Sequence, residues 1–158
     1  MIIGVISDTH LVEVSSEFVK IYQKYLQDVE LLIHCGDFVG EEVVSFLSTH
    51  PNFKGVRGNC DFGLDLPLTQ KFSFNSWKIG LVHGYGFAQL HHRPESLLSQ
   101  FPDCNLICFG HTHKRFFGQI NDCFLLNPGT TQVGKVNSSL AILDWSPEKS
   151  PQVEFVKL

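Results

Sequence analysis

The sequence predicts one α/β domain in which two mixed β-sheets pack face to face and helices lie outside. Three observations support this prediction: the first third alternates strand-like and helix-like segments, a hairpin pattern follows, and the chain from Lys114 onward is strand-like throughout. Alternation of strands and helices is typical of a parallel sheet with right-handed crossovers. The 158 residues match one ordinary domain, which buries about 70% of its unfolded surface, and no composition shift divides them, so we expect a single domain, 1–158.

The first segments are three apolar runs separated by two amphipathic stretches. Uninterrupted β-branched runs suit strands that are covered on both faces, and apolar residues three and four apart indicate helices. The expected elements are strands at 2–7, 30–37 and 53–56 and helices at 15–27 and 41–50, the first capped by Ser15 or Ser16 and the second ended by Pro51.

The later segments are mostly β. Alternating residues on both sides of Asn75-Ser76 predict a hairpin, and turn signals such as Asn-Asp, Pro-Gly and Ser-Pro separate the runs that follow. The expected elements are a hairpin over 68–84, a helix from Glu95 to Gln100, and strands at 105–110, 115–120, 123–127, 138–145 and 153–158.

Composition excludes several classes of protein. The chain is 43% hydrophobic with a net charge of −4 and no cluster of basic residues, so binding to long nucleic acid is not expected. No segment approaches 18 apolar residues and the start has no basic leader, so we expect no membrane anchoring. Five cysteines occur singly without a C-x-x-C pair, which favours a reducing, cytoplasmic compartment.

Oxygen or nitrogen donors follow the carboxyl ends of successive predicted strands, the rim where ligands bind in open α/β sheets. Aspartate supplies anionic oxygen, imidazole suits borderline metals, and an asparagine carbonyl adds a neutral ligand. The i, i+2 spacing in "DTH" and "HTH" is expected to point both side chains the same way from an extended segment. Such a set can supply four ligands to each of two cations that share one carboxylate. The seven donors are Asp8, His10, Asp37, Asn59, His83, His111 and His113.

A single histidine is more often a solvated or hydrogen-bonded residue than a ligand. We expect His50, His91 and His92 to be exposed, in or beside helices. His34 lies inside an apolar run, so a hydrogen-bonded place in the core or behind a ligand is expected for it.

The ordered series "DTH", "GD", "GNCD", "HG", "GHTH" and "NPGT", spread over 1–129, resembles the calcineurin-like metallophosphoesterase superfamily, and most of all its small phosphodiesterase branch, which also contains the metal-poor retromer subunit. The resemblance implies a four-layer α-β-β-α sandwich. It also implies two divalent cations and a hydroxide that bridges them and attacks phosphorus in line. We expect Mn²⁺ to be the metal that supports activity, with Ni²⁺, Fe²⁺, Zn²⁺ or Mg²⁺ as alternatives. By position, the ligands are Asp8, His10, Asp37 and His113 for one metal, and Asp37, Asn59, His83 and His111 for the other.

The chain departs from the family pattern at Cys60, where many members carry a histidine oriented by the next acidic residue, here Asp61. We take Asn59, Cys60 and Asp61 as candidate catalytic residues. A thiol beside two cations is a poor proton donor, which favours diesters over monoesters; the alternative is that Cys60 only fills space. Tyr85 either donates a hydrogen bond to phosphate or packs, and the loop of His91, His92 and Arg93 either attracts anions or is solvated.

The sequence therefore predicts a phosphodiesterase that acts on a small soluble phosphodiester. The alternative is a protein-interaction scaffold of the same fold with little or no activity, for which Phe116 and Phe117 are candidate surface aromatics, although phenylalanines in strands more often lie in the core. A closed structural zinc site is disfavoured because such sites use cysteine and histidine in tetrahedral sets. The physiological substrate and the oligomeric state, a homo-oligomer included, are left open.

Overall fold

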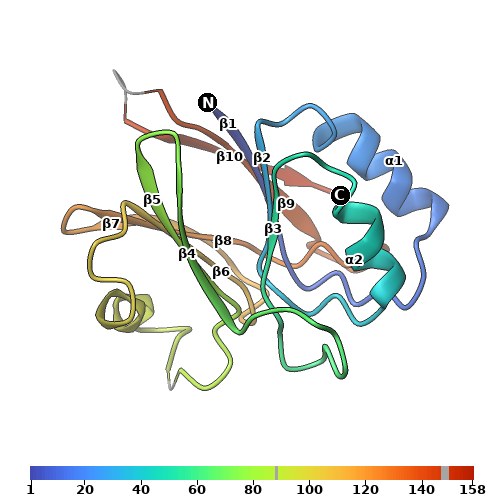
Figure 1. The fold of residues 1–158 in the computed structure, drawn as a ribbon, viewed down its shortest axis with the longest axis horizontal. Helices are drawn as coiled ribbons and strands as arrows, with labels where there is room; N and C mark the ends of the chain where they lie inside the picture. Colours follow the sequence, from blue (N-terminus) through green and yellow to red (C-terminus); the bar gives the residue numbers. More distant parts are fainter. Residues whose placement is uncertain (88, 147–149) are drawn as a thin grey trace.

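The computed structural model describes residues 1–87, 89–146 and 150–158 (Figure 1). Its elements confirm most of the predicted segments. They are β1 (Ile2–Ile6), α1 (Ser16–Tyr25), β2 (Leu31–His34), α2 (Glu41–Leu47), β3 (Phe53–Gly55), β4 (Thr69–Phe74), β5 (Trp77–Val82), the 3₁₀ helix η1 (Pro94–Ser99), β6 (Leu106–Phe109), β7 (Arg115–Ile120), β8 (Cys123–Pro128), β9 (Ser139–Asp144) and β10 (Gln152–Lys157).

The strands form two mixed five-stranded sheets, as predicted. The first has the order β10-β9-β1-β2-β3, in which β1, β2 and β3 are parallel and β9 and β10 are antiparallel. The second has the order β4-β5-β6-β8-β7, in which β5, β6 and β8 are parallel and the edge strands β4 and β7 are antiparallel. The parallel strands lie in the middle of both sheets, apart from the edge strand β3. The loops that follow their carboxyl ends can therefore meet at one rim of the sandwich.

Three apolar layers hold the sandwich together. Between the sheets, Val5, Ile33 and Leu81 are fully buried, and Trp77 stacks on Trp145 with ring centroids 3.9 Å apart. Helices α1 and α2 cover the outer face of the first sheet (Figure 1), where Phe18 and Leu47 join its apolar side chains. On the outer face of the second sheet, Leu97 of η1 packs with Phe101 and Ile107. These contacts give the four layers of the predicted sandwich.

The fourth layer is thinner than predicted. The segment expected to be a helix from Glu95 to Gln100 is a 3₁₀ helix over Pro94–Ser99. The preceding Arg93 makes no side-chain cap, and six residues are too few to repay helix nucleation without one. The buried Leu97 anchors this short segment on the sheet.

The chain after α2 corrects one expectation. Helix α2 ends at Leu47, and His50, expected to be exposed, is only 3% exposed. Its Nε2 lies 3.0 Å from the Val29 carbonyl and its Nδ1 accepts from the Asn52 N–H, so the imidazole joins two loops. His91 and His92 are exposed, as predicted. In the described part of the chain, no helix is both long and apolar enough to cross a membrane.

Candidate metal centre

The loops that follow β1, β2, β5 and β6 meet at one rim of the sandwich. Direct hydrogen bonds join them: the Asp8 N–H donates to the Gly36 carbonyl, and the His111 N–H donates to Oδ2 of Asp8. The imidazole of His83 contacts the Cys35 carbonyl at 2.8 Å. Loops from both sheets are therefore fastened to one another around the predicted donors.

One group of donors gathers around Asp8. Its Oδ1 lies 3.0 Å from Nε2 of His113 and 4.0 Å from Nε2 of His10. Nε2 of His10 is also 3.8 Å from Oδ2 of Asp37. The ligand atoms of Asp8, His10 and His113 all lie within 4.8 Å of one another, and Asp37 lies beside them. This group matches the four residues predicted for the first metal.

A second group shares the same Asp37 oxygen. Nε2 of His83 lies 3.4 Å from Oδ2 of Asp37 and 3.1 Å from Oδ1 of Asn59. The ring of His111 meets that of His83 edge to face, with centroids 5.2 Å apart. Asp37 therefore faces both groups, as a shared ligand would. His111 lies less close to the other donors. Its ring contacts His83, but among the described residues it belongs to none of the groups of histidine, cysteine and acidic side chains whose ligand atoms lie within 4.8 Å of one another.

The backbone at the donors is unusual. Five of the seven donors have left-handed φ angles between 49° and 66°, and Val39, a β-branched residue in the same loop as Asp37, has a φ of 83°. The pairs in "DTH" and "HTH" are therefore bent, and the expected extended segments are wrong. Left-handed conformations cost free energy outside glycine and cluster at functional sites. The five donors are Asp8, His10, Asp37, His111 and His113.

Asp8 offers a test of whether the site suits a cation. Its carboxylate is fully buried, and Oδ2 accepts from the Ser7 hydroxyl and the His111 N–H. Oδ1 receives no hydrogen bond from any described residue, although Nε2 of His113 is 3.0 Å away. A buried anionic oxygen without a donor is costly, and a cation is the partner that removes the cost. The carboxylate, imidazole and amide donors thus fit divalent metals.

Hydrogen bonds select the tautomers of two buried histidines. A carbonyl can only accept, so Nδ1 of His83 carries a proton given to Cys35, and its Nε2 faces the oxygens of Asp37 and Asn59. Nε2 donates to them when the ring is protonated and turns its lone pair toward the same place when the ring is neutral, the form that binds a metal. In His34, Nδ1 accepts from the Gly36 N–H, so Nε2–H points at the Thr9 hydroxyl 3.1 Å away. His34 thus ties together the loops after β1 and β2, which confirms its hydrogen-bonded place in the core.

The charge states of Asp37 and His83 are coupled. Burial alone raises the pKa of Asp37, but hydrogen bonds from His83 and Cys60 outweigh it and hold the pKa of this carboxyl well below its ordinary value. Burial likewise lowers the pKa of His83, and the hydrogen bond to Asp37 outweighs burial and raises it. Asp37 is therefore an anion in the folded protein, which is the state a metal requires.

Asp61 holds the loops on which the donors sit. Its Oδ2 accepts the backbone N–H groups of Asp37 at 2.9 Å and Gly58 at 2.7 Å, and its Oδ1 accepts that of Val39 at 2.8 Å. A Cβ added to Gly58 would collide with the carboxylate of Asp37, so only glycine allows this approach. Asp61 is a positioning residue because it acts through the backbone of its neighbours.

Cys60 lies beside His10 and Asp37. Its backbone N–H donates to Oδ1 of Asp37 at 2.8 Å, and its Sγ lies within 4.8 Å of ligand atoms of His10 and Asp37. Burial, followed by the hydrogen bond to Asp37, raises the pKa of the thiol to about 11. The thiol is therefore protonated in the metal-free protein.

A further clamp was missed by residue-level reasoning. The Asn127 side chain donates to the Gly110 carbonyl and to the Thr112 hydroxyl between the two histidines of "HTH". The Thr130 hydroxyl donates to the Asp8 carbonyl. Both residues belong to the "NPGT" run, which begins at the end of the predicted strand 123–127. That position at a strand end, which it shares with the donors, was the signal available in the sequence.

The two mixed five-stranded sheets are those of a metallophosphoesterase. A family model described as the calcineurin-like phosphoesterase superfamily domain matches residues 1–148, and the chain belongs to that superfamily. It is 32% identical over 152 residues to a protein of Methanothermobacter thermautotrophicus named "Probable metallophosphoesterase", covering 94% of this chain and 88% of the relative.

Two further likenesses point to different members of the superfamily. A phosphodiesterase of Methanocaldococcus jannaschii is 29% identical over 147 residues, with 82% of this chain and 83% of the relative covered. Vps29 of Entamoeba histolytica, solved in complex with Zn²⁺, superposes with a TM-score of 0.76 at 22% identity over 99% of both chains. The second likeness shows the fold alone.

Proposed function

We propose that this single domain is a dinuclear metal-dependent phosphodiesterase that acts on small phosphodiesters. The observation that carries the proposal is Asp37, whose Oδ2 lies 3.8 Å from Nε2 of His10 and 3.4 Å from Nε2 of His83 and so faces both donor groups. Asp8, His10, Asp37 and His113 would hold one cation, and Asp37, Asn59, His83 and His111 the other. Bound there, divalent cations would supply Lewis acidity for in-line displacement at phosphorus.

The residues of the chain prepare the site for that chemistry. Asp61 and Asn127 hold the donor loops in place, and the Cys35 carbonyl keeps the Nε2 lone pair of His83 turned toward the centre. At the edge, Nζ of Lys135 lies 3.2 Å from Nδ1 of His113, so a cationic side chain lies beside the donors and would favour an anionic phosphate there.

Cys60 supports diesters over monoesters as substrates. It occupies the position at which the family resemblance implies a histidine, and its thiol is a weaker hydrogen-bond donor than an imidazolium. A leaving group that requires little proton donation is therefore favoured. The diester preference, like the choice of Mn²⁺ as first metal, is part of the proposal.

The test starts from protein stripped with a chelator and reloaded with Mn²⁺. We expect hydrolysis of a chromogenic diester, slower hydrolysis of the matching monoester, and loss of both in the variant Asp37→Ala/His113→Ala. The matched control is His92→Ala, which removes an exposed imidazole outside the donor set. Metal content is measured on the same samples, so lost activity can be assigned to lost metal. Activity that survives the double substitution would overturn the assignment of the site.

A second candidate function is a protein-interaction scaffold, the reading that the likeness of fold to Vps29 favours. Exposed apolar side chains beside the donors support it: Phe62 is 88% and Tyr85 68% exposed. Phe116 and Phe117, the surface aromatics suggested by the sequence, are half-buried and pack against the core. No turnover with any of Mn²⁺, Ni²⁺, Fe²⁺, Zn²⁺ or Mg²⁺, in protein that demonstrably binds metal, would favour this function.

A further inference from the structure

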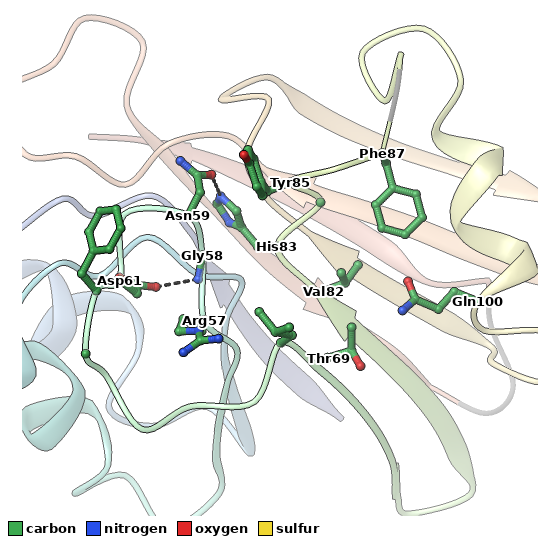
Figure 2. Close-up of a pocket in the computed structure, with 14 residues that line it drawn as sticks. Arg57, Gly58, Asn59, Asp61, Thr69, Val82, His83, Tyr85, Phe87 and Gln100 are labelled. Carbon is green, nitrogen blue, oxygen red and sulfur yellow. Dashed lines mark hydrogen bonds between the residues drawn. The ribbon is translucent and has the colours of Figure 1, made fainter.

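A cavity of about 710 Å³ opens directly beside the donor set. Asn59 and His83 line it, so the cavity and the second donor group share residues (Figure 2). Ligand pockets of drug-sized molecules occupy about 300–1,000 Å³, and a mononucleotide falls in that range. The cavity is therefore large enough for a substituent that is attached to a phosphate at the donors.

Exposed apolar side chains concentrate on this cavity. Among the described residues, five large apolar side chains are highly exposed, and three of them line the cavity: Phe62 at 88%, Tyr85 at 68% and Leu68 at 62%. Phe87 adds a half-buried ring to the lining (Figure 2). Exposed apolar surface gathered at one concave place marks a binding site more than scattered side chains do.

Tyr85 connects the aromatic walls with the donors. Its ring meets that of His111 edge to face with centroids 5.8 Å apart, and it follows His83 by two residues. A ligand group that lies against Tyr85 is thus close to the donors that would hold a phosphate. The Tyr85 side chain is exposed and lines the cavity, and is not packed in the core.

The polar residues of the cavity complete its chemistry. Arg57, Thr69 and Gln100 line it away from the donors (Figure 2), and they offer both hydrogen-bond donors and acceptors. The carboxylate of Asp61 also borders the cavity, but its oxygens already accept three backbone N–H groups. A planar ring with a hydrogen-bonding edge suits such walls better than an alkyl chain, which cannot use the polar groups, or a sugar, whose faces carry hydroxyl groups and cover less of an aromatic ring.

We propose that this cavity binds the nucleobase of a nucleotide phosphodiester, with Tyr85 and Phe62 as the stacking side chains that determine specificity. The inference rests on the proposed phosphodiesterase function and narrows its substrate class. Stacking of a base on an aromatic side chain typically changes affinity roughly 5- to 150-fold, so each ring has a measurable effect.

Binding to the Mn²⁺-loaded protein is the first test, with adenosine 5′-monophosphate and methyl phosphate as probes in isothermal titration calorimetry. We expect Tyr85→Ala and Phe62→Ala each to weaken the nucleotide about tenfold more than they weaken methyl phosphate. The matched control is Val12→Ala, which truncates an exposed apolar side chain, 69% exposed, that does not line the cavity. Equal losses for both probes, or equal affinities of the wild-type protein for them, would overturn the inference.

Kinetics with two diesters that share one leaving group test the nucleobase site separately from the phosphodiesterase activity. The substrates are the 4-nitrophenyl ester of thymidine 5′-monophosphate and methyl 4-nitrophenyl phosphate. We expect Tyr85→Ala to lower kcat/KM about tenfold more for the nucleoside ester than for the methyl ester. Turnover of both esters with equal loss in the variant leaves the phosphodiesterase standing and overturns the nucleobase site. Nucleotide-selective binding with no turnover of either ester supports the nucleobase site and overturns the phosphodiesterase.

Discussion

Asp61→Asn is expected to destabilise the protein although the substitution keeps the size and shape of the side chain. The carboxylate accepts three backbone N–H groups, two at Oδ2 and one at Oδ1, and is 2% exposed. An amide has one accepting oxygen, so at best it keeps the two bonds at the Oδ2 position and turns its NH₂ toward the N–H of Val39. One buried N–H then loses its acceptor and faces a donor, and the two remaining bonds lose the charge of their acceptor.

The size of the effect follows from these losses. An unsatisfied buried N–H costs about 1–3 kcal/mol, and the weakening of two charge-assisted bonds adds about 1 kcal/mol or more, which gives about 3 kcal/mol in all. For a chain of this length that corresponds to a drop of roughly 6–12 °C in Tm. Urea unfolding of chelator-treated protein measures the change without metal linkage. The matched control is Asp65→Asn on the same loop, where the side chain is exposed. A change below about 1 kcal/mol for Asp61→Asn would refute the role of this carboxylate.

Three other substitutions test separate parts of the account. Stripped protein is expected to bind two Mn²⁺ ions per chain in calorimetry, and Asp37→Ala to weaken both by at least about tenfold, as loss of a ligand shared by two ions requires; a wild-type stoichiometry of one contradicts the dinuclear site. Cys60→His is expected to raise monoester hydrolysis relative to diester hydrolysis, and an unchanged ratio means that the thiol only fills space. His50→Leu is expected to cost about 1–3 kcal/mol in urea unfolding because the buried Val29 carbonyl loses its partner and the part-buried Asn52 N–H loses its acceptor. The exposed His92→Leu is expected to cost less than about 0.5 kcal/mol.

Much of the fold was predictable because its signals are local. The apolar runs that became β1, β2 and β6 are each uninterrupted, and the alternation around Asn75-Ser76 led to the hairpin of β4 and β5. The donors were predictable for the same reason, since each follows a strand. The burial of His50 was not predictable, because the carbonyl that it contacts belongs to Val29, 21 positions away.

The surroundings of Asp61 and Tyr85 could not be predicted from the sequence either. Nothing near Asp61 in the sequence indicates that its carboxylate accepts from the backbone of Asp37 and Val39, 24 and 22 positions earlier. The cavity at Tyr85 is built from loops after β3 and β5 and from the end of η1, so its aromatic walls gather only in three dimensions. Sequence patterns located the chemistry, whereas long-range packing decided what surrounds it.

The backbone at the donors shows how these long-range contacts serve the site. Left-handed φ angles at Asp8, Asp37 and His111 persist only where other contacts compensate for their cost. The compensating contacts are the long-range ones: the Asp8 carbonyl accepts from Thr130, the Asp37 N–H donates to Asp61, and the His111 N–H donates to Oδ2 of Asp8. Asp8 and Asp37 are thus held by Thr130 and Asp61, which lie outside the donor set, whereas His111 is held by another donor. Substitutions at Thr130 and Asp61 should therefore reduce metal affinity while every ligand remains present.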